Sequence, residues 1–76
     1  MIKPAAKETI RMCIKVPRKE IVFVDMIFKA SEGIALLTVG DLKDGILYLD
    51  MTEGTRPDVM GILEDMKERI NLEIIS

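Results

Sequence analysis

The chain has 76 residues, of which 49% are apolar and 32% are charged, with a formal net charge of −2. This length accommodates one small domain and excludes a second. The slightly acidic balance argues against binding to nucleic acid or an anionic membrane through bulk charge.

Cysteine and histidine usage excludes several chemistries. Cys13 is the single cysteine and the chain has no histidine. An internal disulfide, a zinc site and an iron–sulfur centre are therefore excluded, and the commonest general base is absent. We expect no metal and no cofactor.

The hydropathy pattern bears on localisation. Uninterrupted apolar runs reach only four residues, so nothing in the sequence predicts a membrane span. Residues 1–7 lack the apolar segment of a signal peptide, and we expect a loose tail there and a single domain over residues 8–76. A reduced, cytoplasmic setting is the expectation, and the isoleucine- and charge-rich composition is thermophile-like.

The first predicted element is a strand over residues 9–16. Its apolar residues alternate with polar ones, so one face is buried and the other faces water. The apolar positions are Ile10, Met12, Ile14 and Val16.

Residues 21–31 are ambiguous between strand and helix. The β-branched start favours a strand, but Pro17 before it, Gly33 after it and the spacing of Asp25 and Lys29 favour a helix. We predict a helix with an unusually wide apolar stripe, which indicates a second partner. The residues expected to face the sheet are Phe23, Met26, Ile27 and Ala30.

The middle of the chain predicts a hairpin. Residues 34–39 and 46–51 have strand length and composition, and a polar loop joins them. Gly45 is expected to supply a positive-φ position.

A second helix and a closing strand follow. Thr55 is the predicted N-cap residue, Pro57 lies in the first turn, and Asp65 and Arg69 form an expected i,i+4 ion pair. Residues 70–74 alternate again as a strand. The apolar positions of this helix are Val59, Ile62, Leu63, Met66 and Ile70.

The predicted order is therefore β-α-β-β-α-β. Right-handed crossovers around one hairpin give an α+β, ferredoxin-like sandwich, with a four-stranded antiparallel sheet and two helices on one face. The other face would carry Arg11, Cys13 and Lys15, with Tyr48, Asp50, Asn71 and Glu73 from other strands.

The segment between the first strand and the first helix is the candidate binding site. Arg18 and Lys19 lie where helix amides and two cations would converge on an anion. The alternative is that they are ordinary solvated cations.

Other functions find less support. Base stacking on RNA needs aromatic residues on the open sheet face, and Tyr48 stands alone there. Metal carriage needs two thiols, and an acylphosphatase-like phosphate loop needs a glycine beside Arg18. The carboxylates show no motif spacing, so we expect no enzymatic activity and no catalytic residue.

Four short motifs lie between residues 16 and 49. They are Val16-Pro17-Arg18 with Ile21, Glu32-Gly33-Ile34-Ala35, Thr38-Val39-Gly40-Asp41 and Gly45-Ile46-Leu47. Together they resemble a small, uncharacterised bacterial family whose domain has no known function. That resemblance implies no catalytic residue.

At the level of topology the chain is similar to ACT-type regulatory domains. This similarity implies pairing of subunits and binding of an amino acid or other small effector by the loop after the first strand, here residues 16–20. We therefore expect a homodimer or higher homo-oligomer that binds a small anionic ligand near Arg18, Lys19, Glu32 and Gly33. The alternatives are a protein-interaction adaptor with no small ligand and, with less support, an RNA binder.

Overall fold

The computed structural model describes residues 9–31 and 33–76, so the predicted tail over residues 1–7 lies outside the described residues. The described part contains four strands, two α-helices and one short 3-10 helix. In chain order they are β1 (Ile10–Lys15), η2 (Arg18–Glu20), α1 (Ile21–Ala30), β2 (Leu36–Asp41), β3 (Ile46–Met51), α2 (Arg56–Lys67) and β4 (Glu73–Ile74).

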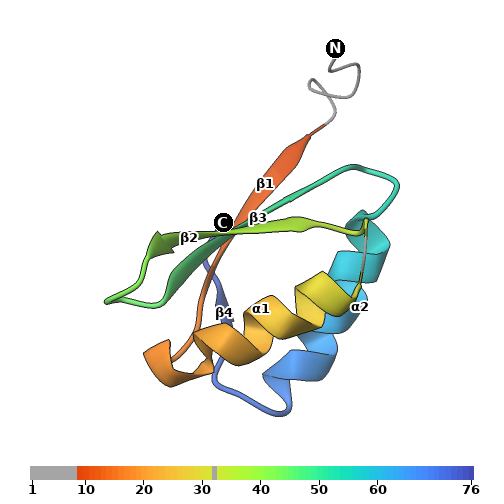
Figure 1. The fold of residues 1–76 in the computed structure, drawn as a ribbon. Helices are drawn as coiled ribbons and strands as arrows, with labels where there is room; N and C mark the ends of the chain where they lie inside the picture. The colour runs from red at the N-terminus through yellow and green to blue at the C-terminus, as the bar shows by residue number, and fades with distance from the viewer. Residues whose placement is uncertain (1–8, 32) are drawn as a thin grey trace.

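The four strands form one antiparallel sheet in the order β2-β3-β1-β4. Both helices lie on the same side of this sheet (Figure 1). The fold class predicted from the sequence, an α+β, ferredoxin-like arrangement, is confirmed.

The core lies between the two central strands and the helices. The alternation predicted for the first strand is confirmed, because Met12, Ile14 and Val16 are buried while Arg11 and Lys15 are exposed. The matching core residues of β3 are Leu47, Leu49 and Met51, and those of α2 are Val59, Leu63 and Met66.

The helix assignment of α1 is confirmed, but the predicted inward face is wrong in part. Ile21, Val24 and Phe28 are buried, whereas Met26 is 61% exposed and Ala30 is exposed as well. Phe23 and Ile27, predicted to face the sheet, are half-buried and pack against the edge of the core. Apolar residues occupy so much of the helix circumference that the sequence does not fix which of them point inward.

Two strands differ in extent from the sequence predictions. β2 spans Leu36–Asp41 rather than residues 34–39, and its pairing with β3 is irregular between Val39 and Asp41. β4 is shorter than predicted because the amide of Ile70 still donates to the Met66 carbonyl oxygen at 2.8 Å, extending the turn that ends α2.

The start of α2 is where the sequence predicted it. Thr55 is the N-cap residue, but its hydroxyl caps no helix amide and instead contacts the Thr52 hydroxyl at 3.2 Å. The predicted ion pair between Asp65 and Arg69 is confirmed at 3.3 Å.

The end of β1 is joined to the start of β3 by a close backbone contact. The amide of Val16 donates to the Gly45 carbonyl oxygen at 2.9 Å. Gly45 has φ +70°, as predicted, and a Cβ there would collide with the Val16 carbonyl oxygen. Only glycine combines this backbone conformation with so close an approach.

The open face of the sheet carries a cross-strand cluster. Arg11 donates from Nε and Nη2 to the two carboxylate oxygens of Asp50, at 2.9 and 3.1 Å, and its guanidinium lies 4.9 Å from the centre of the Tyr48 ring. Hydrogen bonding from Arg11, with its positive charge, holds the pKa of the Asp50 carboxyl below its ordinary value.

Replacing Gly45 with alanine tests the contact at the end of β1. The left-handed conformation alone disfavours alanine by about 1–2 kcal/mol, and the collision with Val16 adds to that, so the free energy of unfolding in urea should fall by more than this amount. Gly61→Ala is the matched control, because a Cβ there meets open space and helix propensity should raise stability by up to about 1 kcal/mol. Equal stability of Gly45→Ala and the unaltered protein would contradict the account.

Asp50→Asn tests the open-face pair through its pH dependence. The folded-state pKa of Asp50 lies below its unfolded-state value, so the pair's stabilisation is present at neutral pH and is lost as the pH falls below about 5 through the folded-state pKa. Urea unfolding at a series of pH values should therefore show the variant's deficit shrinking on acidification. Arg11→Met should reproduce this behaviour, and a deficit that does not change with pH would refute it.

Candidate functional site

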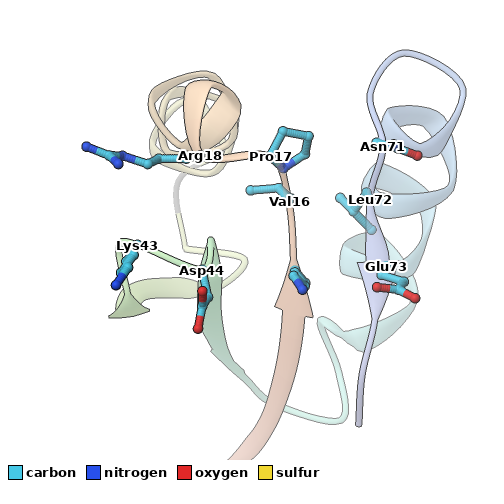
Figure 2. Close-up of a pocket in the computed structure, with 9 residues that line it drawn as sticks. Val16, Pro17, Arg18, Lys43, Asp44, Asn71, Leu72 and Glu73 are labelled. Atoms are coloured by element: carbon cyan, nitrogen blue, oxygen red, sulfur yellow. The ribbon is translucent and has the colours of Figure 1, made fainter.

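A groove of about 550 Å³ lies at the end of β1. It has the size of a small-molecule site, for which the usual range is about 300–1,000 Å³. Its lining comes from the end of β1 and the loop after it, the β2–β3 loop, and the segment that enters β4 (Figure 2). The lining residues are Lys15, Val16, Pro17, Arg18, Lys43, Asp44, Asn71, Leu72 and Glu73.

The strand register explains why these segments meet. Lys15, the last residue of β1, pairs with Ile46 at the start of β3 and with Glu73 at the start of β4. Because both neighbours run antiparallel to β1, the residues that precede them lie on either side of the chain as it leaves the sheet. The hydrogen bond from Val16 to Gly45 fixes the β2–β3 loop in this position.

The groove carries charges of both signs. Arg18 and Lys43 lie on the same side of the β1 end as Asp44, and Glu73 lies on the other side (Figure 2). Lys15 adds a third cation at the end of the strand. Within residues 9–31 and 33–76, none of the five charged side chains that line the groove forms an ion pair.

These charges are chemically available to a ligand. Arg18 offers a planar set of N–H donors that fits a carboxylate or phosphate in a bidentate manner, and Lys43 offers a compact positive charge. Asp44 and Glu73 offer acceptors for an ammonium group. The arrangement therefore suits a small molecule with an anionic group, or a zwitterion with one charge of each sign.

The structure does not bring the sequence-predicted site residues together. Arg18 lines the groove, but its exposed neighbour Lys19 does not. Glu32 lies outside the described residues. Gly33, at φ +80°, follows the far end of α1, and a ten-residue helix separates it from Arg18 by about 15 Å.

Sequence reasoning missed the residues that the other segments contribute. Lys43, Asp44 and Glu73 have no motif spacing relative to Arg18, so no local pattern identifies them. The signal that places them is topological. In the sheet order β2-β3-β1-β4, the residues before β3 and before β4 must flank the residues after β1.

A second hollow, of about 650 Å³, adjoins Gly33 at the opposite end of β1. Its principal polar groups already have partners, because Asp50 is bound by Arg11 and the hydroxyls of Thr52 and Thr55 contact each other. It is therefore a weaker candidate than the groove beside Arg18.

The described residues contain neither a cluster of metal-ligating side chains nor a membrane-spanning helix. In residues 9–31 and 33–76, no group of three or more acidic or cysteine side chains is placed to hold a metal ion. Over the same residues, no helix has the length and apolar character that crossing a bilayer requires.

Comparison with known proteins identifies a family and no activity. No curated protein and no solved structure matches the chain. A family model described as a domain of unknown function, DUF4911, matches residues 14–70, which is about three-quarters of the chain and includes all the motifs on which the resemblance was based. The chain therefore belongs to the DUF4911 family of domains of unknown function.

Proposed function

We propose that this protein is a non-enzymatic, ACT-like regulatory domain of the cytoplasm that binds an amino acid or another small anion and acts as a homo-oligomer. The observation that carries the proposal is the groove at the end of β1, where Lys15, Arg18 and Lys43 line the same hollow without ion-pair partners among the described residues. Unpaired cations around a hollow of ligand size favour an anionic occupant.

The position of the groove supports the ACT-like part of the proposal. In ACT-type domains the loop between the first strand and the first helix binds the effector, and the corresponding segment here, Val16 to Glu20, contributes Val16, Pro17 and Arg18 to the lining. ACT sequences place a glycine beside the proline, so that backbone amides meet the ligand. In this chain Arg18 stands there, and we propose that its guanidinium replaces those amides as the anion-binding group.

The edge strand β2 supports self-association. Its outer side has no strand partner in the described sheet. Val39 pairs with the fully buried Leu47 and so belongs to the core-facing side, yet it is 45% exposed. Leu36 and Leu42, within and just after the strand, are exposed as well. Antiparallel pairing of two β2 strands would satisfy the edge amides and carbonyls and give Leu36 and Val39 cross-strand neighbours on their respective faces.

The alternative is a protein-interaction module that binds no small ligand. Val22 and Met26 on α1, 68% and 61% exposed, favour this alternative because they give the helical side of the domain an apolar surface of its own.

The small-ligand proposal is tested by measuring the Tm of the protein in the presence of a panel of amino acids, organic acids and nucleotides. A compound at 100 times its Kd stabilises by about 2.7 kcal/mol, and each kcal/mol shifts the Tm of so small a domain by about 4–8 °C. Arg18→Ala should raise the Kd of the active compound by about tenfold or more, as expected for loss of a charged hydrogen bond.

Lys19→Ala is the matched control, because it removes the same charge from the next residue, which does not line the groove. A flat response to the whole panel would refute the small-ligand proposal and leave the interaction module. Equal loss of binding in both variants would show that general charge, and not the groove, attracts the ligand.

Val39→Lys tests the homo-oligomer. A lysine at the proposed interface should shift sedimentation at tens of micromolar from oligomer to monomer, because the ammonium group would lose its hydration there. Ile75→Lys is the control, since Ile75 is similarly exposed, at 50%, but follows β4 at the opposite edge of the sheet. A monomeric unaltered protein, or disruption by Ile75→Lys alone, would count against pairing through β2.

A further inference from the structure

A second groove, of about 510 Å³, runs between α1 and α2 on the helical side of the domain, away from the residues of the β1 groove. Its floor is apolar, formed by the half-buried Phe23 and Ile27 of α1 together with Ile62 and Met66 of α2. Pro57, Asp58, Gly61, Asp65 and Arg69 complete the lining.

Gly61 has no role in the packing of the domain itself. It lies in the interior of α2, where glycine is less favourable than alanine by about 1 kcal/mol. A Cβ built at this position meets nothing within 4 Å, so no neighbour in the described structure requires the glycine. Its effect is to leave a notch in the wall of the groove, where the backbone of α2 is open to close approach.

The dimensions of the groove suit a helix. Its lining on the α2 side extends from Pro57 to Arg69, a length of about 18 Å at 1.5 Å per residue. Two helices side by side present a seam into which the apolar stripe of a third helix packs.

The charges on the rim indicate what kind of helix. Asp65 is already paired with Arg69 at 3.3 Å, whereas Asp58 forms no ion pair within residues 9–31 and 33–76. The rim is therefore acidic around an apolar floor. The carboxylate that lacks a partner favours an occupant that brings a lysine or arginine to Asp58.

We propose that the groove between α1 and α2 binds an amphipathic helix of another protein, with its apolar stripe on Phe23, Ile27 and Ile62 and a small residue against Gly61. A lysine or arginine beside the stripe lies next to Asp58. This interaction surface goes beyond the proposed anion-binding function and does not rest on it, because the two grooves share no residue.

A displayed library of helical peptides tests the proposal directly. Each peptide has about 18 residues, a fixed apolar stripe and flanking positions randomised among Lys, Glu, Ser and Ala, and is selected against the full-length domain. Selection should enrich Lys at flanking positions. Measured with purified selected peptides, Gly61→Gln should weaken binding at least tenfold by filling the notch, while urea unfolding confirms that this variant folds.

Asp58→Asn tests whether the groove carboxylate attracts a cationic residue, and Glu64→Gln is its matched control. Both remove one carboxylate from α2, but Glu64 lies outside the groove, so only Asp58→Asn should weaken the lysine-bearing peptides, by about three- to tenfold. No selected binder, enrichment of Glu, or equal binding to Gly61→Gln would overturn the proposal. A dimer of the unaltered protein that Gly61→Gln dissociates would assign the groove to a second copy and overturn it too.

Discussion

The backbone contact between Val16 and Gly45 is the constraint on which the rest of the arrangement depends. It continues the six-residue ladder between β1 and β3 by one further hydrogen bond, past the point where β1 ends. It also fixes where the chain turns towards α1. Because Gly45 has no Cβ, the Val16 carbonyl oxygen lies directly against its backbone, and the β2–β3 loop is held against the end of β1. A bulkier residue would separate the two central strands at the place where the core, the hairpin and the groove meet.

The groove beside Arg18 is a consequence of that constraint. Lys43 and Asp44 precede Gly45 directly, so the contact that closes the ladder also holds their side chains near the β1 end. Glu73 reaches the same place from the other side through its pairing with Lys15. The charges are exposed and screened by water, so they contribute little to stability. The proposed binding of a small anion would use these charges, because stability does not require them.

The sequence predicted the topology because residues 9–16 alternate cleanly and Gly45 marks the turn of the hairpin that became β2 and β3. It could not predict the inward face of α1, since Val22, Phe23, Val24, Met26, Ile27 and Phe28 leave almost no polar side to orient the helix. Packing against the sheet decides the rotation, and that information lies in tertiary structure. For the site, the sequence identified Arg18. It grouped Arg18 with Gly33, although the length of α1 separates them, and it missed Lys43 and Glu73, which sheet order alone brings near.

The hydrophobic residues of this small domain divide between a buried core and two exposed surfaces, one on β2 and one on α1. Two helices cover the central strands, and twelve hydrophobic residues in the described structure are buried there. The hydrophobic residues that stay exposed lie on surfaces that have no partner within the domain. Val39 lies on an edge strand whose outer backbone lacks a partner, and Val22 and Met26 extend the apolar surface of the helix that forms one wall of the groove with Gly61. A 76-residue domain buries only about 60% of the surface of its unfolded chain, so association on either surface would add to the stability of the fold itself. Folding and recognition in this protein are therefore expected to be thermodynamically linked.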